Sequence, residues 1–176
     1  MEQSSRIINK CIGLLEQADD LLKSMDETVF VSTCRISPRG SIGAHLRHVL
    51  DFYQCFLAGI ESSRVDYDKR ERNPKIERDL NSALTRVGSL IEDLGLLSSI
   101  DEQEFLLVSA EDDGSGSHFS CNSSVLRELV FLESHTVHHY SLIAMILRLH
   151  EIEPPENFGV APSTLSYWNE RAACAR

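Results

Sequence analysis

The sequence predicts an all-α fold, a four-helix bundle with a long crossover that contains a small β-hairpin between the third and fourth helices. Four long stretches carry apolar residues at the spacing of a helix face, which is the main observation behind this fold class. Between the third and fourth stretches, two short apolar runs flank a cluster of Asp, Gly and Ser, a pattern typical of a hairpin. The 176 residues suffice for one core, so we expect a single helical-bundle domain over residues 1–176.

The first two expected helices lie in the N-terminal third of the chain. The first runs from about Ser4 to Ser24 and carries one wide apolar stripe. The second begins near Ser41, after the helix breakers Pro38 and Gly40, and extends to about Glu61.

The third expected helix opens with Asn73 and Pro74, an N-cap residue followed by proline at the first helical position. It continues to about Leu94, and Gly95 is its stop signal. The fourth runs from about Ser124 to His150 and ends before two consecutive prolines.

The connections differ in character. The link over residues 62–72 is short and charged, and we expect it to be irregular. The hairpin is expected over residues 105–109 and 118–121, with its turn over residues 112–117. A crossover of this length allows consecutive helices to lie parallel. Residues 164–173 are expected to form one last short helix, capped by Ser163.

Composition excludes several classes of protein. Lys and Arg number 17 against 27 Asp and Glu, and this net charge of −10 disfavours nucleic acid as a partner. No apolar stretch approaches the roughly 20 residues that a membrane span requires, and no signal peptide is visible. The five cysteines are scattered and form no CxxC pair, which excludes zinc ribbons and indicates a cytoplasmic protein.

The fourth expected helix carries a histidine pair that can bind a metal. His135 and His139 lie about 40° apart and one turn from each other on a helix. Leu132, Leu142 and Ile146 share this face, so we expect it to point into the core. Two imidazoles at this spacing on one inward face are suited to binding a single metal ion.

The second expected helix supplies a third candidate ligand, His48. Its neighbours on the same face are small or apolar, which suggests that this face also looks inward (Ala44, Phe52, Cys55 and Gly59). His48 opposite the His135/His139 pair would complete a set of three histidines. Three protein ligands leave coordination positions for water or substrate, as in catalytic sites. Imidazole suits zinc, nickel, copper and iron, so the residues alone do not choose the metal.

Other polar residues near these faces have two interpretations each. His45 and His138 lie at the edges of the two faces, where they would support ligand histidines or simply face solvent. Asp51 would orient His48 or His45, or be a charge at the rim. Glu128, about two turns before His135, would accept a hydrogen bond from a ligand histidine or be an exposed acid in the first helical turn. For each ligand histidine, the alternative is a packed structural residue.

The second helix is also apolar on its opposite side, at Leu46, Leu50 and Leu57. A helix with two apolar faces is buried on both, either by neighbouring elements or by a second subunit. A homodimer is therefore one hypothesis.

The segments Ser41–His48 and His135–His139 resemble the DinB-like family of metal-binding four-helix bundles. The first resembles the family's small-x-x-His-Leu-x-x-His context, and the second its His-x-x-x-His pair. Carried over residue by residue, the resemblance implies His48, His135 and His139 as metal ligands. It also implies nickel or zinc as the metal, and often a dimer. Related bundles are thiol transferases that use bacillithiol or mycothiol, or isomerases.

Two functions follow as hypotheses. The first is a cytosolic divalent-metal-binding protein, a metal-dependent thiol transferase or hydrolase, in which the ion lowers the pKa of a bound small-molecule thiol or water. The second is a non-catalytic metal-binding or protein-interaction module with structural histidines. A fourth protein ligand, such as His45 or Cys55, would favour the second hypothesis, because it would close the site to substrate.

Overall fold

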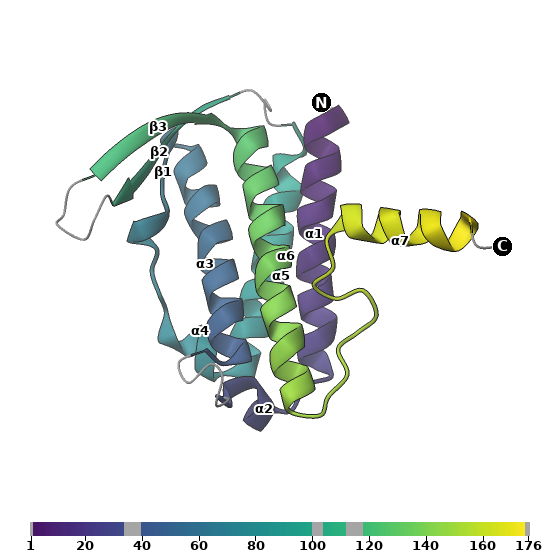
Figure 1. The fold of residues 1–176 in the computed structure, drawn as a ribbon. Coiled ribbons are helices and arrows are strands. Elements are labelled where there is room, and N and C mark those ends of the chain that lie inside the picture. Colours follow the sequence, from purple (N-terminus) through teal and green to yellow (C-terminus); the bar gives the residue numbers. More distant parts are fainter. Residues whose placement is uncertain (1, 34–39, 100–103, 112–117, 175–176) are drawn as a thin grey trace.

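The computed structural model describes residues 2–33, 40–99, 104–111 and 118–174, and the statements below concern these residues. This part of the chain is mostly helical (Figure 1). Its seven α-helices are α1 (Glu2–Lys23), α2 (Glu27–Val31), α3 (Ile42–Ile60), α4 (Pro74–Arg78), α5 (Leu80–Gly95), α6 (Val125–Leu149) and α7 (Pro162–Cys174). Two short 3-10 helices, η1 (Tyr67–Lys69) and η2 (Leu96–Ser99), complete the helical elements.

A three-stranded mixed sheet lies at one end of the long helices (Figure 1). Its strands are β1 (Arg64–Asp66), β2 (Phe105–Glu111) and β3 (His118–Ser124). The central strand β2 pairs parallel with β1, where Val65 is opposite Val108, and antiparallel with β3, where Val108 is opposite Cys121. The crossover before α6 is therefore bound to the link that follows α3.

The prediction of an all-α four-helix bundle is wrong, because the described residues form seven helices and a mixed sheet. The segment over residues 62–72 is not irregular: it contains β1 and η1. A strand of three residues is too short to show the alternation that identifies strands in a sequence. Its burial depends on distant partners, since Val65 is 1% exposed and its strand pairs with β2. The expected hairpin runs lie within β2 and β3; the expected turn at 112–117 and Pro38 lie outside the described residues.

The third expected helix is two helices, α4 and α5, separated at Asp79. The backbone of Asp79 is extended, with φ −129° and ψ 112°. Its carboxylate accepts a hydrogen bond of 2.6 Å from the backbone N–H of Ser82 and so caps α5. The side chain of Asn73 caps α4 in the same way, by accepting from the N–H of Lys75. The sequence signal for this break is Asp79, a capping residue that lies within an otherwise continuous helical spacing of apolar residues.

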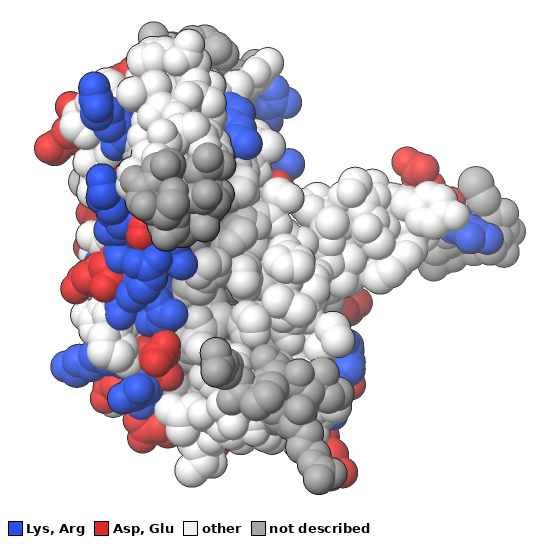
Figure 2. All heavy atoms as spheres, turned by 60° about the vertical axis from the view of Figure 1, so that its left-hand side comes forward, with Lys and Arg blue, Asp and Glu red and all other residues white. Residues whose placement is uncertain are grey.

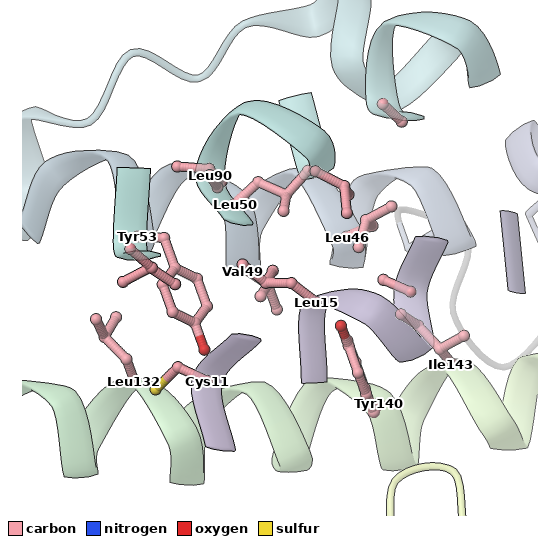
Figure 3. Close-up of a cluster of buried hydrophobic side chains, with 14 of the residues drawn as sticks. Cys11, Leu15, Leu46, Val49, Leu50, Tyr53, Leu90, Leu132, Tyr140 and Ile143 are labelled. Carbon is pink, nitrogen blue, oxygen red and sulfur yellow. The ribbon is translucent and has the colours of Figure 1, made fainter. Parts of the chain in front are cut away.

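The long helices enclose one hydrophobic core (Figure 3). Helix α1 packs against α5 and α6, and α3 packs against the same two helices. Tyr53 from α3, Cys11 from α1 and Leu132 from α6 meet in this core, and each is fully buried. Burial of a large apolar side chain contributes roughly 1.5–3 kcal/mol, so a core of this size stabilises the fold without a metal.

Helix α3 presents to the core the side that the sequence suggested was its back. Leu46 and Leu50 are 2% and 1% exposed and pack among α1, α5 and α6. His48 and Phe52, on the opposite side, are half-buried. The expectation that the His48 face points into the core is therefore wrong. Because the chain's own helices cover the Leu46 side, this side requires no second subunit, and the homodimer remains a prediction.

The link between α3 and α5 runs back along α3, because two glycines allow it to approach closely. A Cβ atom on Gly59 would lie 2.4 Å from the carbonyl oxygen of Arg64, which precedes the centre of β1. A Cβ atom on Gly43 would lie 2.2 Å from the carbonyl oxygen of Glu77 in α4. Larger side chains would push the link away at both ends. The link therefore lies against the half-buried face of α3.

Helix α7 extends away from the other helices (Figure 1). Its aromatic residues Tyr167 and Trp168 are about half exposed. Within the described ranges, no helix combines the length and the apolar character needed to cross a bilayer.

Candidate metal centre

Three histidines from two helices meet on one side of the α3–α6 interface. His48 of α3 and His135 and His139 of α6 each offer a ring nitrogen, and these nitrogens all lie within 4.8 Å of one another. The ring centroids are separated by 5.0 Å for His48 and His135, 4.7 Å for His48 and His139, and 4.6 Å for His135 and His139. The structure thus brings together all three residues predicted as metal ligands, and we call them the histidine cluster.

Helix capping and core packing set the position of the histidine cluster. Ser41 and Ser124 cap α3 and α6, and each hydroxyl accepts a hydrogen bond from a backbone N–H of the first turn. On α6 the core face carries Thr136 and Tyr140, which are fully buried. The histidines lie beside that face and are half-buried. The expectation that they point into the core is corrected: they lie half-buried at its edge.

The histidine cluster is electrically neutral near pH 7. Burial lowers the pKa of His48 to about 4, that of His135 to about 4 and that of His139 to about 3. Neighbouring histidines lower these pKa values further, because several positive charges cannot share so small a volume. Neutral imidazoles keep a free lone pair, the form in which histidine binds metal ions.

His45 contacts the histidine cluster without belonging to it. Its Nδ1 lies 3.1 Å from Nδ1 of His139, at hydrogen-bond distance. When Nδ1 of His139 is the donor in this bond, the lone pair of its Nε2 is free to bind an ion. A partner on the second ring nitrogen fixes the orientation of a ligand histidine. His45 thus lies at hydrogen-bond distance from a candidate ligand, and its supporting role stays a prediction.

Aromatic rings enclose one side of the histidine cluster. Phe52 stacks on His135 with 4.3 Å between ring centroids, and it lies 4.7 Å from His48. Phe131, one helical turn before His135, stacks on its ring at 5.5 Å. Tyr67 of η1 stacks on Phe52 at 4.8 Å. Nδ1 of His135 is buried and has no hydrogen-bond partner among the described residues.

Asp51 binds an arginine and not a histidine. Its carboxylate accepts a 2.6 Å hydrogen bond from Nη1 of Arg47, and Nε of Arg47 donates to Glu77 at 2.8 Å. This ion-pair chain joins α3 to α4. Asp51 is 5% exposed, and burial raises the pKa of its carboxyl group. Among the described residues its carboxylate is bound to Arg47, so the role of Asp51 in orienting His48 or His45 stays a prediction.

Glu128 lies in a network of its own above the histidine cluster. It is completely buried, so the alternative of an exposed first-turn acid is wrong. Its carboxylate accepts hydrogen bonds of 2.7 Å from the Tyr67 hydroxyl, 2.5 Å from the Ser123 hydroxyl and 2.7 Å from the Arg127 guanidinium. It is connected to the histidine cluster through Tyr67 and Phe52, and in the described structure it accepts no hydrogen bond from a ligand histidine.

The remaining histidines lie outside the centre. His138 is exposed and contacts His139 edge to face, with ring centroids 5.2 Å apart. His118 is exposed on β3. His150 caps the end of α6, and its Nε2 is 2.9 Å from the Ser32 hydroxyl. Cys55, offered as a possible fourth ligand, is hydrogen-bonded to the carbonyl of Asp66 at 3.4 Å.

Sequence reasoning missed three residues of the surroundings: Tyr67, Arg70 and Phe131. Phe131 had a detectable signal, because it precedes His135 by four residues on the same helix face. Tyr67 and Arg70 had none, because a link without periodicity does not show which side chains turn back toward a helix.

The residues fit a divalent transition metal. Three neutral imidazoles at facing positions provide nitrogen donors of the kind that zinc and nickel bind. In the same cluster, Nδ1 of His135 is buried and makes no hydrogen bond among the described residues, so its bonding capacity is unused. All three histidines are half-buried, so part of each one is in contact with solvent.

No family model matches the chain. A protein of Rhizopus delemar named "FK506-binding protein 5" is 31% identical over 163 residues, which cover 91% of this chain and 37% of that protein. The chain therefore spans little more than a third of the length of this relative. These findings correct the description as a DinB-like four-helix bundle, since the relative bears another name and the structure has a mixed sheet.

Proposed function

We propose that His48, His135 and His139 bind one divalent transition-metal ion, nickel or zinc, and that this centre activates a small molecule. The observation that carries the proposal is the convergence of three ring nitrogens within 4.8 Å of one another. Histidines that only pack at the edge of a core would not need to bring their ring nitrogens together. The low pKa values of the three rings support the proposal, because protons compete little with the metal at neutral pH.

The proposed activity is that of a metal-dependent thiol transferase or hydrolase. A bound metal would supply Lewis acidity that lowers the pKa of a thiol or water molecule at the site. The chain's own residues hold the site: His45 fixes the ring of His139, and Phe52 and Phe131 shield His135 on one side. The scattered cysteines support a reducing cytoplasm as the location.

One observation favours the alternative, a non-catalytic metal-binding module. His45 lies close enough to His139 to approach the ion if its ring turns. A fourth imidazole would close the coordination sphere and give a structural site. The number of histidines bound to the metal therefore separates the two functions.

Metal content tests the centre itself. Untagged wild-type protein is expected to contain close to one nickel or zinc ion per chain, measured by mass spectrometry after gel filtration. The variant His135→Ala/His139→Ala is expected to lose it, while His138→Ala, which removes the adjacent exposed imidazole, retains it. Equal, substoichiometric metal in all three proteins would refute the centre.

X-ray absorption at the metal edge tests the choice between the two functions. A catalytic site gives three imidazoles plus exchangeable oxygen, and added thiol replaces that oxygen by sulfur. Four imidazoles in wild type and three in His45→Ala would instead establish the non-catalytic module. Turnover of thiol-transfer and ester substrates by the metal-loaded wild type, and not by the double variant, completes the test.

A further inference from the structure

Arg70 lies beside the histidine cluster, although it is remote from it in sequence. Its guanidinium carbon is 5.4 Å from the centroid of the Phe52 ring. The same ring is 4.3 Å from the centroid of His135 and 4.7 Å from that of His48. The guanidinium carbon therefore lies no farther from the centre of either imidazole ring than the two distances through Phe52 added together. One small molecule can span that separation.

The hydrogen bonds of Arg70 leave part of its guanidinium unused. Nη1 donates to the carbonyl oxygen of Tyr67 at 2.8 Å. The same nitrogen is 3.9 Å from a carboxylate oxygen of Asp68, an ion pair without a hydrogen bond. Nε is buried and has no partner among the described residues. A guanidinium has five N–H donors in a planar fork, and an unsatisfied donor is unfavourable when it is buried.

The Arg70 side chain is held in place. Tyr67, which accepts its hydrogen bond, is itself fixed by the bond from its hydroxyl to buried Glu128. The Arg70 side chain is 17% exposed, so its position is set by the protein while part of it remains accessible. A positioned guanidinium loses less conformational freedom when a ligand binds than a free surface arginine does.

Charged groups of both signs surround Arg70: Arg72 and Arg47 are basic, and Asp51 and Asp68 are acidic. The nearby carboxylate of Asp51 is bonded to Arg47. Burial and the charge of Arg72 lower the pKa of Arg70, and the charge of Arg70 in turn lowers the pKa of His48 and His135. Figure 2 shows Lys and Arg side chains interspersed with Asp and Glu on the face that carries the link between η1 and α4.

We propose that Arg70 binds an anionic group, a carboxylate or a phosphate, of the small molecule that the histidine cluster activates. This inference rests on the proposed function and adds the class of substrate. The substrate carries an anionic group at one end. At the other end it carries either a thiol that binds the metal or a reactive centre that water can reach. Carboxylate and phosphate share the geometry that suits a planar guanidinium fork. Arg70 is a binding residue in this scheme and takes no part in proton transfer.

The first experiment uses cobalt-loaded protein, whose visible spectrum reports thiolate binding to the ion. The probes are 3-mercaptopropionate, which is anionic, and 2-mercaptoethanol, which is neutral and of similar size. Wild type is expected to bind 3-mercaptopropionate about tenfold more tightly or better, the effect of one charge-assisted hydrogen bond. Arg70→Met is expected to lose this preference and to bind 2-mercaptoethanol as wild type does.

The control is Lys69→Met, which removes a positive charge from the neighbouring, 74% exposed side chain. Lys69→Met is expected to retain the preference for 3-mercaptopropionate. Solvent and salt screen the charge of an exposed lysine, whereas they do not screen a direct contact between Arg70 and the anion. Arg70→Lys keeps the charge without the fork and should fall between the two. An equal preference in wild type and Arg70→Met, or no preference in wild type, would overturn the proposal.

A second experiment separates this proposal from the metal centre. In metal-free ¹⁵N-labelled protein, the Nε–H signal of Arg70, assigned by its absence from Arg70→Met, is followed during titration with acetate and, separately, with inorganic phosphate. A saturable shift supports anion binding, and the tighter anion identifies carboxylate or phosphate. If the wild type binds no cobalt, the proposed function fails while this titration still decides on Arg70. Absence of a saturable shift with both anions would refute the role of Arg70.

Discussion

Helix α6 carries two polar clusters about two turns apart, and they are built in opposite ways. Glu128 is completely buried, and three donors from β3, η1 and α6 satisfy its carboxylate. The histidine cluster is half-buried and neutral, and Nδ1 of His135 has no partner among the described residues. A buried charge is tolerated only when it is paired and hydrogen-bonded. Neutral imidazoles at an accessible edge retain their lone pairs for a ligand.

The two clusters differ in how much of their hydrogen-bonding capacity is used within the protein. The Glu128 network binds the sheet and the link to α6, so its bonding capacity is already used within the protein. The histidine cluster retains unused capacity and faces an accessible side. Tyr67 connects the two clusters, because its hydroxyl donates to Glu128 and its ring stacks on Phe52, which in turn stacks on His135.

The largest effect on stability is expected from Glu128→Ala. The change leaves the buried Tyr67 hydroxyl and its neighbours without an acceptor, and we expect a loss of about 3 kcal/mol in the free energy of unfolding. Urea denaturation measures it. The control is Glu92→Ala, an exposed acid on α5, which should change stability by less than about 0.5 kcal/mol. A loss for Glu128→Ala as small as that of the control would remove the distinction between the clusters.

Metal removal is expected to have the next largest effect. With free metal at about one hundred times its Kd, binding to the folded state alone stabilises the protein by about 2.7 kcal/mol. Adding a chelator should abolish this stabilisation in the wild type and change nothing in His135→Ala/His139→Ala. Thermal unfolding with and without chelator measures it. If the double variant responded to metal as the wild type does, the ion would bind elsewhere.

A smaller effect is expected from His45→Ala. Because His45 is bonded to Nδ1 of His139, its loss should weaken metal affinity by roughly 10- to 100-fold while leaving the stoichiometry at saturation unchanged. Competition with a chelating dye measures the affinity, and His118→Ala, a distant exposed histidine, is the matched control. A loss of stoichiometric binding equal to that of His139→Ala would make His45 a ligand.

The smallest effect is the pH dependence of the metal-free protein. In the unfolded chain the histidines take up protons below about pH 6.5, whereas in the folded chain His48 and His135 do so only near pH 4 and His139 near pH 3. The unfolded state therefore binds more protons in this window, and stability falls as the pH falls from about 6.5 toward 4. Partial exposure of the rings keeps the slope shallow. His135→Ala/His139→Ala should show a shallower slope in urea denaturation at a series of pH values; an identical slope would contradict the assigned pKa values.

The sequence by itself determined most of the local structure. Spacing and caps identified α1, α3 and α6, because a long apolar period and residues such as Ser41 and Ser124 act within a few residues. The same spacing predicted the three histidines of the cluster, which the structure brings together. These features depend on interactions between residues that are close together in the sequence.

Tertiary structure decided what depends on contacts between distant segments. Tertiary structure decided which side of α3 is the more deeply buried, since both of its faces are apolar and periodicity does not say which one other helices cover. Strand β1 exists because its backbone pairs with β2, some forty residues later in the chain. The positions of Arg70 and of the Glu128 acceptor follow from that pairing and from the close approach at Gly59. The sequence therefore determined which residues are candidate metal ligands, and the fold decided which of them meet and what surrounds them, because burial and electrostatics depend on all neighbours in space.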